Sequence, residues 1–320
     1  MTSAAAAALA PAPRSNGRLA VTKGHGTHND FVLVDDRDDS LDLGPELVRS
    51  LADRRGGVGG DGVIRLVAAE HLPEGRALAA DDDDVRWFMD YRNADGSVAQ
   101  MCGNGVRVLA AFCERLGLWS GDGELAVGNR AGVRRVRRVP AAAGSAAAWY
   151  AVGRGPVRLT GDAAAEGGDV QVKVAGLDVA RPGLSVDVGN PHAVVALADA
   201  ATLARADLSR APVVVPVPAD GVNVELVVPL GEELVDGEVT GRLRMRVHER
   251  GVGETSSCGT GACAAAAAVQ AWAGQGAPAT WLVDVPGGTV RVRLSGDGSA
   301  ELAGPAVLVA DGLVDLDALG

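Results

Sequence analysis

The feature that most constrains this chain is a short pattern that occurs twice, nearly half the chain apart. Residues 102–105 read Cys-Gly-Asn-Gly, and residues 258–261 read Cys-Gly-Thr-Gly. Each pattern precedes an apolar, alanine-rich stretch that predicts a helix. A thiol repeated at such a position indicates two similarly built halves, each with one cysteine at a helix N-terminus.

The start of a helix gives a cysteine distinctive chemistry. The first N–H groups of a helix are unpaired and carry partial positive charge, which lowers the pKa of a thiol from about 8.5 toward neutrality. Such N–H groups can also hold a carboxylate; here they belong to Gly103, Asn104, Gly259 and Thr260. Two thiols that face one cleft suit a reaction that removes a proton from one face of a carbon and returns it to the other.

The alternative interpretation is a pair of buried structural cysteines beside glycine-rich turns. An inert buried cysteine needs no adjacent glycine, whereas a backbone that closely approaches a ligand does. The doubled pattern therefore favours a functional role for Cys102 and Cys258. Cys113 and Cys263 lie inside the predicted helices and are interpreted as core residues.

Short β-strands are predicted around both helices, and they do not alternate regularly with further helices. That arrangement argues against a doubly wound α/β sheet. The 320 residues suffice for two domains, so an α+β fold of two β-rich domains around a cleft is predicted. Smaller expectations concern three segments: a helix at residues 45–54, an irregular polar loop at 71–84 and a disordered tail at 1–16.

Composition argues against several other classes of protein. The net charge of −11, without a basic stripe, speaks against nucleic-acid binding. No apolar stretch approaches the roughly 18 residues of a membrane span. Four cysteines without a Cys-x-x-Cys pair, and five histidines without ligand spacing, predict neither a metal site nor a disulfide framework. Free thiols fit a reducing cytoplasm.

Polar residues at predicted strand ends and turns add a binding function. Glu249 and Arg250 are adjacent, and together they suit a zwitterionic ligand, with Arg on a carboxylate and Glu on an ammonium. Neutral amides can satisfy both ends of an amino acid; here they are Asn29, Asn93, Asn190 and Asn223. A surface ion pair and ordinary turn formers are the alternative interpretations.

These motifs together resemble the diaminopimelate epimerase family, in the family's order and across about residues 18–315. The segments that carry the resemblance are Asn29–Phe31, Asn93–Ser97, Met101–Gly105, Gly189–His192, Asn223–Glu225, Glu249–Thr255 and Cys258–Gly261. The combination covers nearly the whole chain and is specific.

The resemblance implies a fold and an activity. It implies two pseudo-symmetric, barrel-like domains with a central helix each, at residues 17–151 plus 304–320 and at 152–303, with the active site in the cleft between them. It implies an isomerase that interconverts LL- and meso-diaminopimelate without pyridoxal phosphate or another cofactor, on the route to lysine and peptidoglycan. It further implies a homodimer that binds a small-molecule substrate, and the composition predicts a cytoplasmic protein.

The resemblance also implies a role for each matching residue. Cys102 and Cys258 match the acid and base, and His192 and Glu249 match residues that tune the two thiols. The backbone cradle of the reacting carboxylate corresponds to Gly103, Asn104, Gly259 and Thr260. The substrate contacts correspond to Asn29, Asn93, Asn190, Asn223, Glu249 and Arg250.

One position departs from the family pattern, and two other functions stay open. Many family members carry Gln where this chain has Gly62, so that contact to the substrate is absent or supplied otherwise. A proline-racemase-like isomerase would use the same pair of thiols on a different acid. A non-catalytic amino-acid-binding protein could also share this scaffold, although both cysteines are intact.

Overall fold

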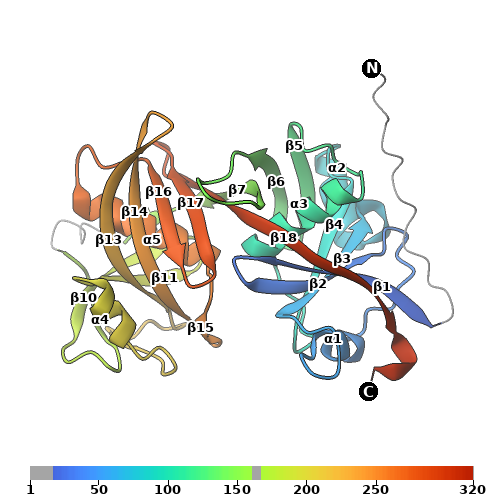
Figure 1. Cartoon of the computed structure of the whole chain (residues 1–320), viewed down its shortest axis with the longest axis horizontal. Helices are drawn as coiled ribbons and strands as arrows, with labels where there is room; N and C mark the ends of the chain where they lie inside the picture. Colours follow the sequence, from blue (N-terminus) through green and yellow to red (C-terminus); the bar gives the residue numbers. More distant parts are fainter. Residues whose placement is uncertain (1–16, 161–166, 320) are drawn as a thin grey trace. The chain divides into compact units, whose positions relative to one another are not determined.

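The computed structural model describes residues 17–160 and 167–319, so the predicted disordered tail lies outside the described residues. The chain divides into two compact units. The first unit consists of Met1–Val152 and Gly304–Gly320, and the second consists of Gly153–Ala303. Each unit is a curved β-structure with a helix among its strands (Figure 1).

In the first unit, eight described strands pair into a closed ring. Each strand pairs with the next, and the last pairs back onto the first. In ring order the strands are β1 (Arg18–Gly26), β2 (Asn29–Asp35), β3 (Gly62–Ala68), β4 (Trp87–Asn93), β5 (Glu124–Asn129), β6 (Gly132–Val139), β7 (Ala148–Pro156) and β18 (Ser299–Asp315). A closed ring leaves no unpaired sheet edge.

The second unit repeats this order of pairings. In both units the successive pairs are antiparallel, parallel, antiparallel, parallel, antiparallel and antiparallel. The strands of the second series are β10 (Arg181–Asp187), β11 (Pro191–Ala196), β13 (Asn223–Val235), β14 (Glu238–Glu249), β16 (Thr280–Val285), β17 (Gly288–Leu294) and the start of β18. The repeated order gives the two units a common topology.

Shorter strands complete the second unit. They are β8 (Arg158–Leu159), β9 (Val170–Lys173), β12 (Val213–Val215) and β15 (Gly253–Thr255). Strand β9 pairs with β10 and β12, β8 pairs with β10, and β15 pairs with β14. None of these additions interrupts the order of the longer strands.

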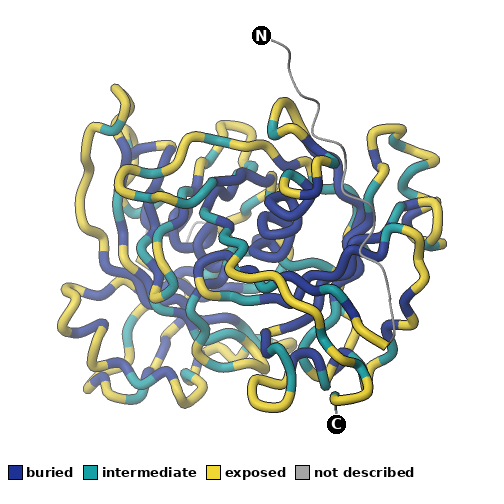
Figure 2. Tube along the Cα trace, turned by 45° about the vertical axis from the view of Figure 1, so that its right-hand side comes forward, coloured by how far each residue is buried: buried dark blue, intermediate teal, exposed yellow. Residues whose placement is uncertain are grey.

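The two long helices occupy equivalent places in this order. Helix α3 (Gly103–Arg115) connects the fourth and fifth strands of the first unit, and α5 (Gly259–Ala273) does the same in the second. Residues Gly103–Cys113 and Gly261–Val269 are buried throughout, because strands surround each helix (Figures 1 and 2). Alanine suits such a helix, since a small side chain lets the strands pack closely around it. The predicted α+β fold of two barrel-like domains with central helices is confirmed.

The shorter helices lie at the ends of strands. They are α1 (Pro45–Ala52), α2 (Pro73–Asp81) and α4 (Ala200–Arg205), with single 3₁₀ turns at Ala69–His71 and Leu316–Ala318. The helix predicted at residues 45–54 is confirmed by α1. The irregular loop predicted at residues 71–84 is wrong, because α2 occupies most of that segment. Only Gly75 of α2 is buried, so the sequence shows little of the apolar face that usually reveals a helix.

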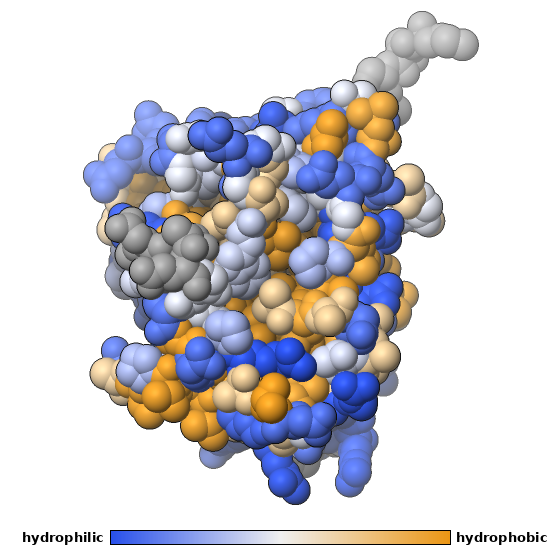
Figure 3. All heavy atoms as spheres, turned by 90° about the vertical axis from the view of Figure 1, so that its left-hand side faces the viewer, coloured by the Kyte–Doolittle hydropathy of each residue, from blue (hydrophilic) through white to orange (hydrophobic). Residues whose placement is uncertain are grey.

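Among the described residues, five clusters of buried apolar side chains form the cores. The largest lies around α5 in the second unit, and a second large one lies around α3 in the first. Apolar and hydrophilic residues are interspersed on the face shown in Figure 3. Within residues 17–160 and 167–319, none of the helices has the length and apolar character needed to cross a membrane.

Candidate active site

Each unit places one thiol at the start of its central helix. Cys102 caps α3 and accepts a hydrogen bond at Sγ from the N–H of Gly105 at 3.5 Å. Cys258 caps α5 and accepts one from the N–H of Gly261 at 3.4 Å. All four cysteines carry free thiols. The helices predicted after both Cys-Gly-x-Gly patterns are therefore confirmed.

In the first unit, Asn29 at the start of β2 contacts the thiol. The Asn29 side-chain oxygen lies 3.4 Å from Sγ of Cys102 and accepts a hydrogen bond from the Asn104 amide at 3.2 Å. The Asn29 amide donates to Asp61 at 2.7 Å. Asn104 also accepts a hydrogen bond at 2.7 Å from Arg107, which is fully buried one turn along α3. Asn29 is thus fixed from both sides beside the thiol.

The second unit has a similar arrangement at equivalent positions, except that the helix residue and not the Asn contacts the thiol. Asn190 directly precedes β11, as Asn29 begins β2, and its amide lies 3.5 Å from the hydroxyl of Thr260. That hydroxyl lies 3.4 Å from Sγ of Cys258. Thr260 corresponds to Asn104, so each thiol has an Asn at a strand end and a polar residue in the first turn of its helix.

Asn93 lies in the same part of the first unit, at the end of β4. Its amide donates to the hydroxyl of Ser97 at 2.9 Å, within a tight turn. The peptide N–H of the following residue, Ala94, donates to the carbonyl of Asp61 at 3.0 Å. The Asn93 side chain is therefore tied to a turn rather than to Cys102.

Glu249, Arg250 and Asn223 form a further group in the second unit. Glu249 ends β14, as Asn93 ends β4, and it accepts a hydrogen bond from the hydroxyl of Thr255. The N–H of Arg250 donates to the side-chain oxygen of Asn223 at 2.9 Å, and the guanidinium donates to the carbonyl of Asp220. The adjacent acid and base predicted from the sequence are held by separate partners and not by each other.

His192 lies inside the second unit, against a carboxylate that sequence reasoning missed. Its Nδ1 is 2.7 Å from Glu225 Oε1, and its Nε2 is 3.1 Å from the side-chain oxygen of Asn190. The side chains of His192 and Glu225 are 0% exposed. The sequence showed Glu225 within a motif, but only the parallel pairing of β11 with β13 shows that it reaches His192.

Titratable groups are distributed unequally between the two units. The second unit places His192, Glu225 and Glu249 near its thiol, whereas the equivalent strand positions of the first unit carry Phe31, Ile64 and Asn93. The strand register identifies these equivalents, because Phe31 on β2 lies opposite Gly62 on β3 just as His192 on β11 lies opposite Asn223 on β13. The surroundings of the two thiols thus share a scaffold and differ in charge.

The pKa of Cys258 corrects one expectation from the sequence. Burial raises that pKa well above its usual value, and the negative charges of Glu249 and Glu225 raise it further. Hydrogen bonds from Thr260 and from the N–H of Gly261 act in the opposite direction but do not overcome these effects. The predicted shift toward neutrality is therefore wrong for Cys258 in this structure.

Gly62 is enclosed by the neighbouring strand. A β-carbon at this position would lie 2.3 Å from the carbonyl oxygen of Arg92 and 2.7 Å from Cε2 of Tyr91. The structure therefore favours glycine where many family members carry Gln. Nearby, Asp61 supplies the carboxylate that accepts the Asn29 amide.

We expect Gly62→Ala to lower the free energy of unfolding by about 1–3 kcal/mol, because the added carbon overlaps a backbone atom. Urea unfolding measures this effect. Gly312→Ala is the matched control, since Gly312 also lies in a strand but has no atom within 4 Å of an added β-carbon. Equal stability of the two variants would show that β3 and β4 separate freely at Gly62.

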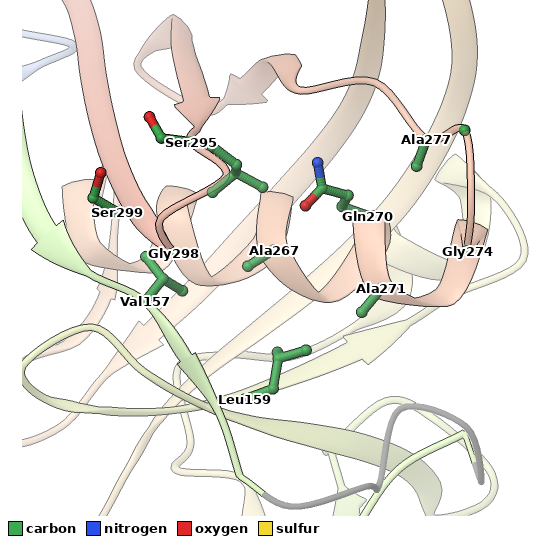
Figure 4. A pocket seen from close by; sticks show the side chains of 12 residues that line it. Val157, Leu159, Ala267, Gln270, Ala271, Gly274, Ala277, Ser295, Gly298 and Ser299 are labelled. Carbon is green, nitrogen blue, oxygen red and sulfur yellow. The ribbon is translucent and has the colours of Figure 1, made fainter.

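A pocket in the second unit lies apart from these residues. It has a volume of about 380 Å³, and Figure 4 shows Gln270, Ala267 and Ala271 of α5 along it. Leu159, Val157 and the turn at Ser295–Ser299 form other parts of its lining. No candidate catalytic or substrate-binding residue lines it. Elsewhere, residues 17–160 and 167–319 contain no group of three or more His, Cys, Asp or Glu side chains placed to hold a metal ion.

Comparison with known proteins decides the family. The diaminopimelate epimerase family model matches residues 21–158 and 184–309. The diaminopimelate epimerase of Streptomyces coelicolor is 46% identical over 307 residues, covering 93% of this chain and 96% of the relative. That of Acidothermus cellulolyticus is 43% identical over 322 residues, covering 93% and 96%.

This chain belongs to the diaminopimelate epimerase family. It is accordingly an isomerase and an amino-acid epimerase, and the family resemblance seen in the sequence is confirmed.

Two solved structures share the fold of this chain. A phenazine biosynthesis protein of the PhzF family from Bacillus anthracis superposes with a TM-score of 0.62 at 14% identity, covering 93% of this chain and 99% of that one. A hydroxyproline epimerase from Agrobacterium vitis superposes with a TM-score of 0.55 at 14% identity, covering 95% and 92%. At this identity the likeness supports the fold alone.

Proposed function

We propose that this enzyme interconverts LL- and meso-diaminopimelate by two-base proton transfer between Cys102 and Cys258. The observation that carries the proposal is the pair of thiols, each capping a central helix at an equivalent position. Cys102 contacts Asn29 directly, and Cys258 is connected to Asn190 through the hydroxyl of Thr260. Family membership supports the substrate, because the curated relatives are named for it.

In the proposed reaction one cysteine begins as thiolate and the other as thiol. The thiolate takes the α-proton, so an S–H bond forms while the C–H bond breaks and its electron pair is left on the α-carbon. The opposite thiol then gives its proton to the other face of that carbon and becomes the thiolate. The reverse reaction exchanges the two roles, so a pH–rate profile reports the pair.

The helix N-termini would stabilise the charge that develops on the substrate. The carbanion's electron pair delocalises into the adjacent carboxylate, which the first N–H groups of the helices would hold. These groups belong to Gly103, Asn104, Gly259 and Thr260.

Polar side chains would bind the rest of the substrate and tune the thiols. We assign substrate contacts to Asn29, Asn93, Asn190, Asn223, Glu249 and Arg250. His192 and Glu249 would tune the thiols, which their positions near Cys258 support. The carboxylate and ammonium of the distal amino-acid group provide the charges that Arg250 and Glu249 complement.

The wider setting follows from the family. We propose that the two domains span 17–151 with 304–320 and 152–303, and that the enzyme acts as a homodimer without pyridoxal phosphate. We further propose a cytoplasmic role in the supply of meso-diaminopimelate for lysine and peptidoglycan.

The experiment that tests the function is incorporation of solvent deuterium into LL-diaminopimelate, followed by NMR under reducing conditions with no cofactor added. We expect deuterium at one α-carbon together with the appearance of meso product. L-Proline and trans-4-hydroxy-L-proline, incubated in parallel, test the proline-racemase-like alternative. Exchange into either of these and none into diaminopimelate would reject the proposed substrate, and binding without exchange would support an amino-acid-binding protein.

A further inference from the structure

Glu225 occupies a position that the fold itself fills with an apolar residue. In the first unit, β2 and β3 pair so that Leu33 lies opposite Ile64. In the second, the equivalent strands β11 and β13 pair so that Val194 lies opposite Glu225. Ile64 and Glu225 are therefore equivalent, and both are 0% exposed. The scaffold needs only a buried side chain here, so packing does not explain the carboxylate.

The carboxylate is also costly to bury. Oε1 of Glu225 lies 2.7 Å from Nδ1 of His192, but the buried Oε2 has no hydrogen-bond partner among the described residues. A buried carboxylate with one oxygen unsatisfied destabilises the fold relative to an apolar residue of similar size. A carboxylate kept at such a position indicates a role other than stability.

The Cys-Gly-x-Gly pattern makes room for this carboxylate. A β-carbon on Gly261 would lie 2.6 Å from Oε1 of Glu225. In the first unit, a β-carbon on Gly105 would instead lie 3.0 Å from Cδ1 of Ile64. The second glycine of each pattern thus lets the helix approach this strand position, and in the second unit it brings the first turn of α5 against Glu225.

A continuous series of contacts connects Glu225 with the thiol. It runs from Glu225 to His192, then to the Asn190 amide, then to the hydroxyl of Thr260 and finally to Cys258, with successive distances of 2.7, 3.1, 3.5 and 3.4 Å. Nε2 of His192 thus faces the side-chain oxygen of Asn190, and Nδ1 faces the carboxylate of Glu225.

We propose that Glu225 is a positioning residue of the reaction, which holds His192 and, through Asn190 and Thr260, the orientation of the Cys258 thiol. The inference rests on the proposed function. Three titratable groups face Cys258 from the elements packed around α5: Glu225 on β13, Glu249 on β14 and, through Asn190, His192 on β11. The side chain of Glu225 contacts His192, and the residues that connect it further to the thiol, Asn190 and Thr260, are themselves assigned to substrate binding.

The test is Glu225→Gln, which keeps the size and the hydrogen bond to His192 but removes the charge. The rate of alkylation of Cys258 by iodoacetamide is measured against pH, with mass spectrometry of the Cys258 peptide. Loss of a nearby negative charge favours the thiolate form of Cys258. We therefore expect the Cys258 midpoint, which is the pH at which the alkylation rate is half-maximal, to fall by about one pH unit. Steady-state kinetics should show kcat lower by about tenfold with KM little changed, because a neutral amide holds His192 less firmly than a carboxylate does and the reacting groups are then less well positioned.

Asp284→Asn is the matched control, since Asp284 is a carboxylate of the same unit paired with Arg242 and Thr289 outside the site. It should leave the Cys258 midpoint and kcat unchanged. A Glu225→Gln variant with both the Cys258 midpoint and the kcat of the wild type would overturn the proposal. Alkylation requires no substrate, so the midpoint stays separate from any failure of diaminopimelate turnover.

Glu225→Asp provides a second variant if Glu225→Gln does not fold. Its carboxylate keeps the charge but is one carbon shorter, so it cannot reach His192 from the same backbone position. We expect kcat to fall about tenfold with KM unchanged. Wild-type kcat in Glu225→Asp would overturn the positioning role.

Discussion

Cys102→Ser and Cys258→Ser will each lower kcat for epimerisation by roughly 10²- to 10⁴-fold, the range that general acid–base groups contribute. A hydroxyl is a far weaker acid than a thiol, so the serine neither forms the anion that takes the α-proton nor delivers a proton at a comparable rate. Both residues cap helices, and serine is a good N-cap, so the free energy of unfolding should change little. Coupled NMR assays of product formation and urea unfolding measure the two quantities.

The two variants should also differ in isotope exchange. Each variant retains one thiol. Each should therefore exchange the α-hydrogen of one stereoisomer for solvent deuterium faster than it converts that stereoisomer into the other. Cys113→Ala is the control, because Cys113 lies in the same helix as Cys102, is fully buried and has a pKa that burial raises to about 12. It should keep its activity at some cost in stability. Full activity in either serine variant would reject the two-thiol mechanism.

Asp90→Asn will lower the free energy of unfolding by about 3–5 kcal/mol, the range seen when one partner of a buried ion pair is removed. Asp90 is 0% exposed on β4 and accepts hydrogen bonds or ion pairs from Arg65, Arg92 and Arg130. The uncharged Asn side chain cannot compensate the positive charges of these three guanidinium groups. Since β4 ends at Asn93, a proposed substrate contact, loss of order in β4 should also raise KM for diaminopimelate. Urea unfolding monitored by tryptophan fluorescence measures the change in stability.

The pH dependence gives an independent check on Asp90. Burial alone would raise the pKa of this carboxyl, but the surrounding guanidinium groups hold it below its usual value. A carboxyl with a lowered folded-state pKa stabilises the protein above its unfolded pKa of about 3.9, and that contribution is lost as the pH falls through the folded value. The wild type should therefore be more stable than Asp90→Asn near neutral pH, and this difference in the free energy of unfolding should shrink only at acidic pH.

Asp84→Asn is the control for this prediction. Asp84 pairs with Arg135 at 3.1 Å, but its side chain is 72% exposed, so the variant should differ from the wild type by less than about 1 kcal/mol. Equal losses in both variants would show that burial does not govern the strength of these ion pairs.

Sequence alone predicted the architecture because its strongest signals are local. The glycine after each cysteine, the alanine-rich stretch that follows and the strand-end Asn residues all lie within short motifs. Helix α2 was missed because its sequence has little apolar periodicity. Glu225 was missed for a different reason: its contact with His192 arises from a parallel pairing whose register no local pattern specifies.

The direction in which the pKa of Cys258 shifts could not be predicted from the sequence, because two effects oppose each other. The helix N-terminus is visible in the sequence, but the burial of the thiol and the two nearby carboxylates arise from tertiary structure. Arg107 similarly follows Cys102 closely in sequence, but only the folded unit shows it fully buried against Asn104. The residues that tune a site are thus harder to predict than those that form it.

The division of the chain has a consequence for how the protein is made. The second unit is continuous in sequence, whereas the ring of the first unit closes only through β18 near the end of the chain. During synthesis, residues 17–152 leave the ribosome before the second unit yet lack their last strand until β18 has been made. The barrel made first therefore closes last, and β1 has a sheet edge without its partner strand while the second unit is already able to fold.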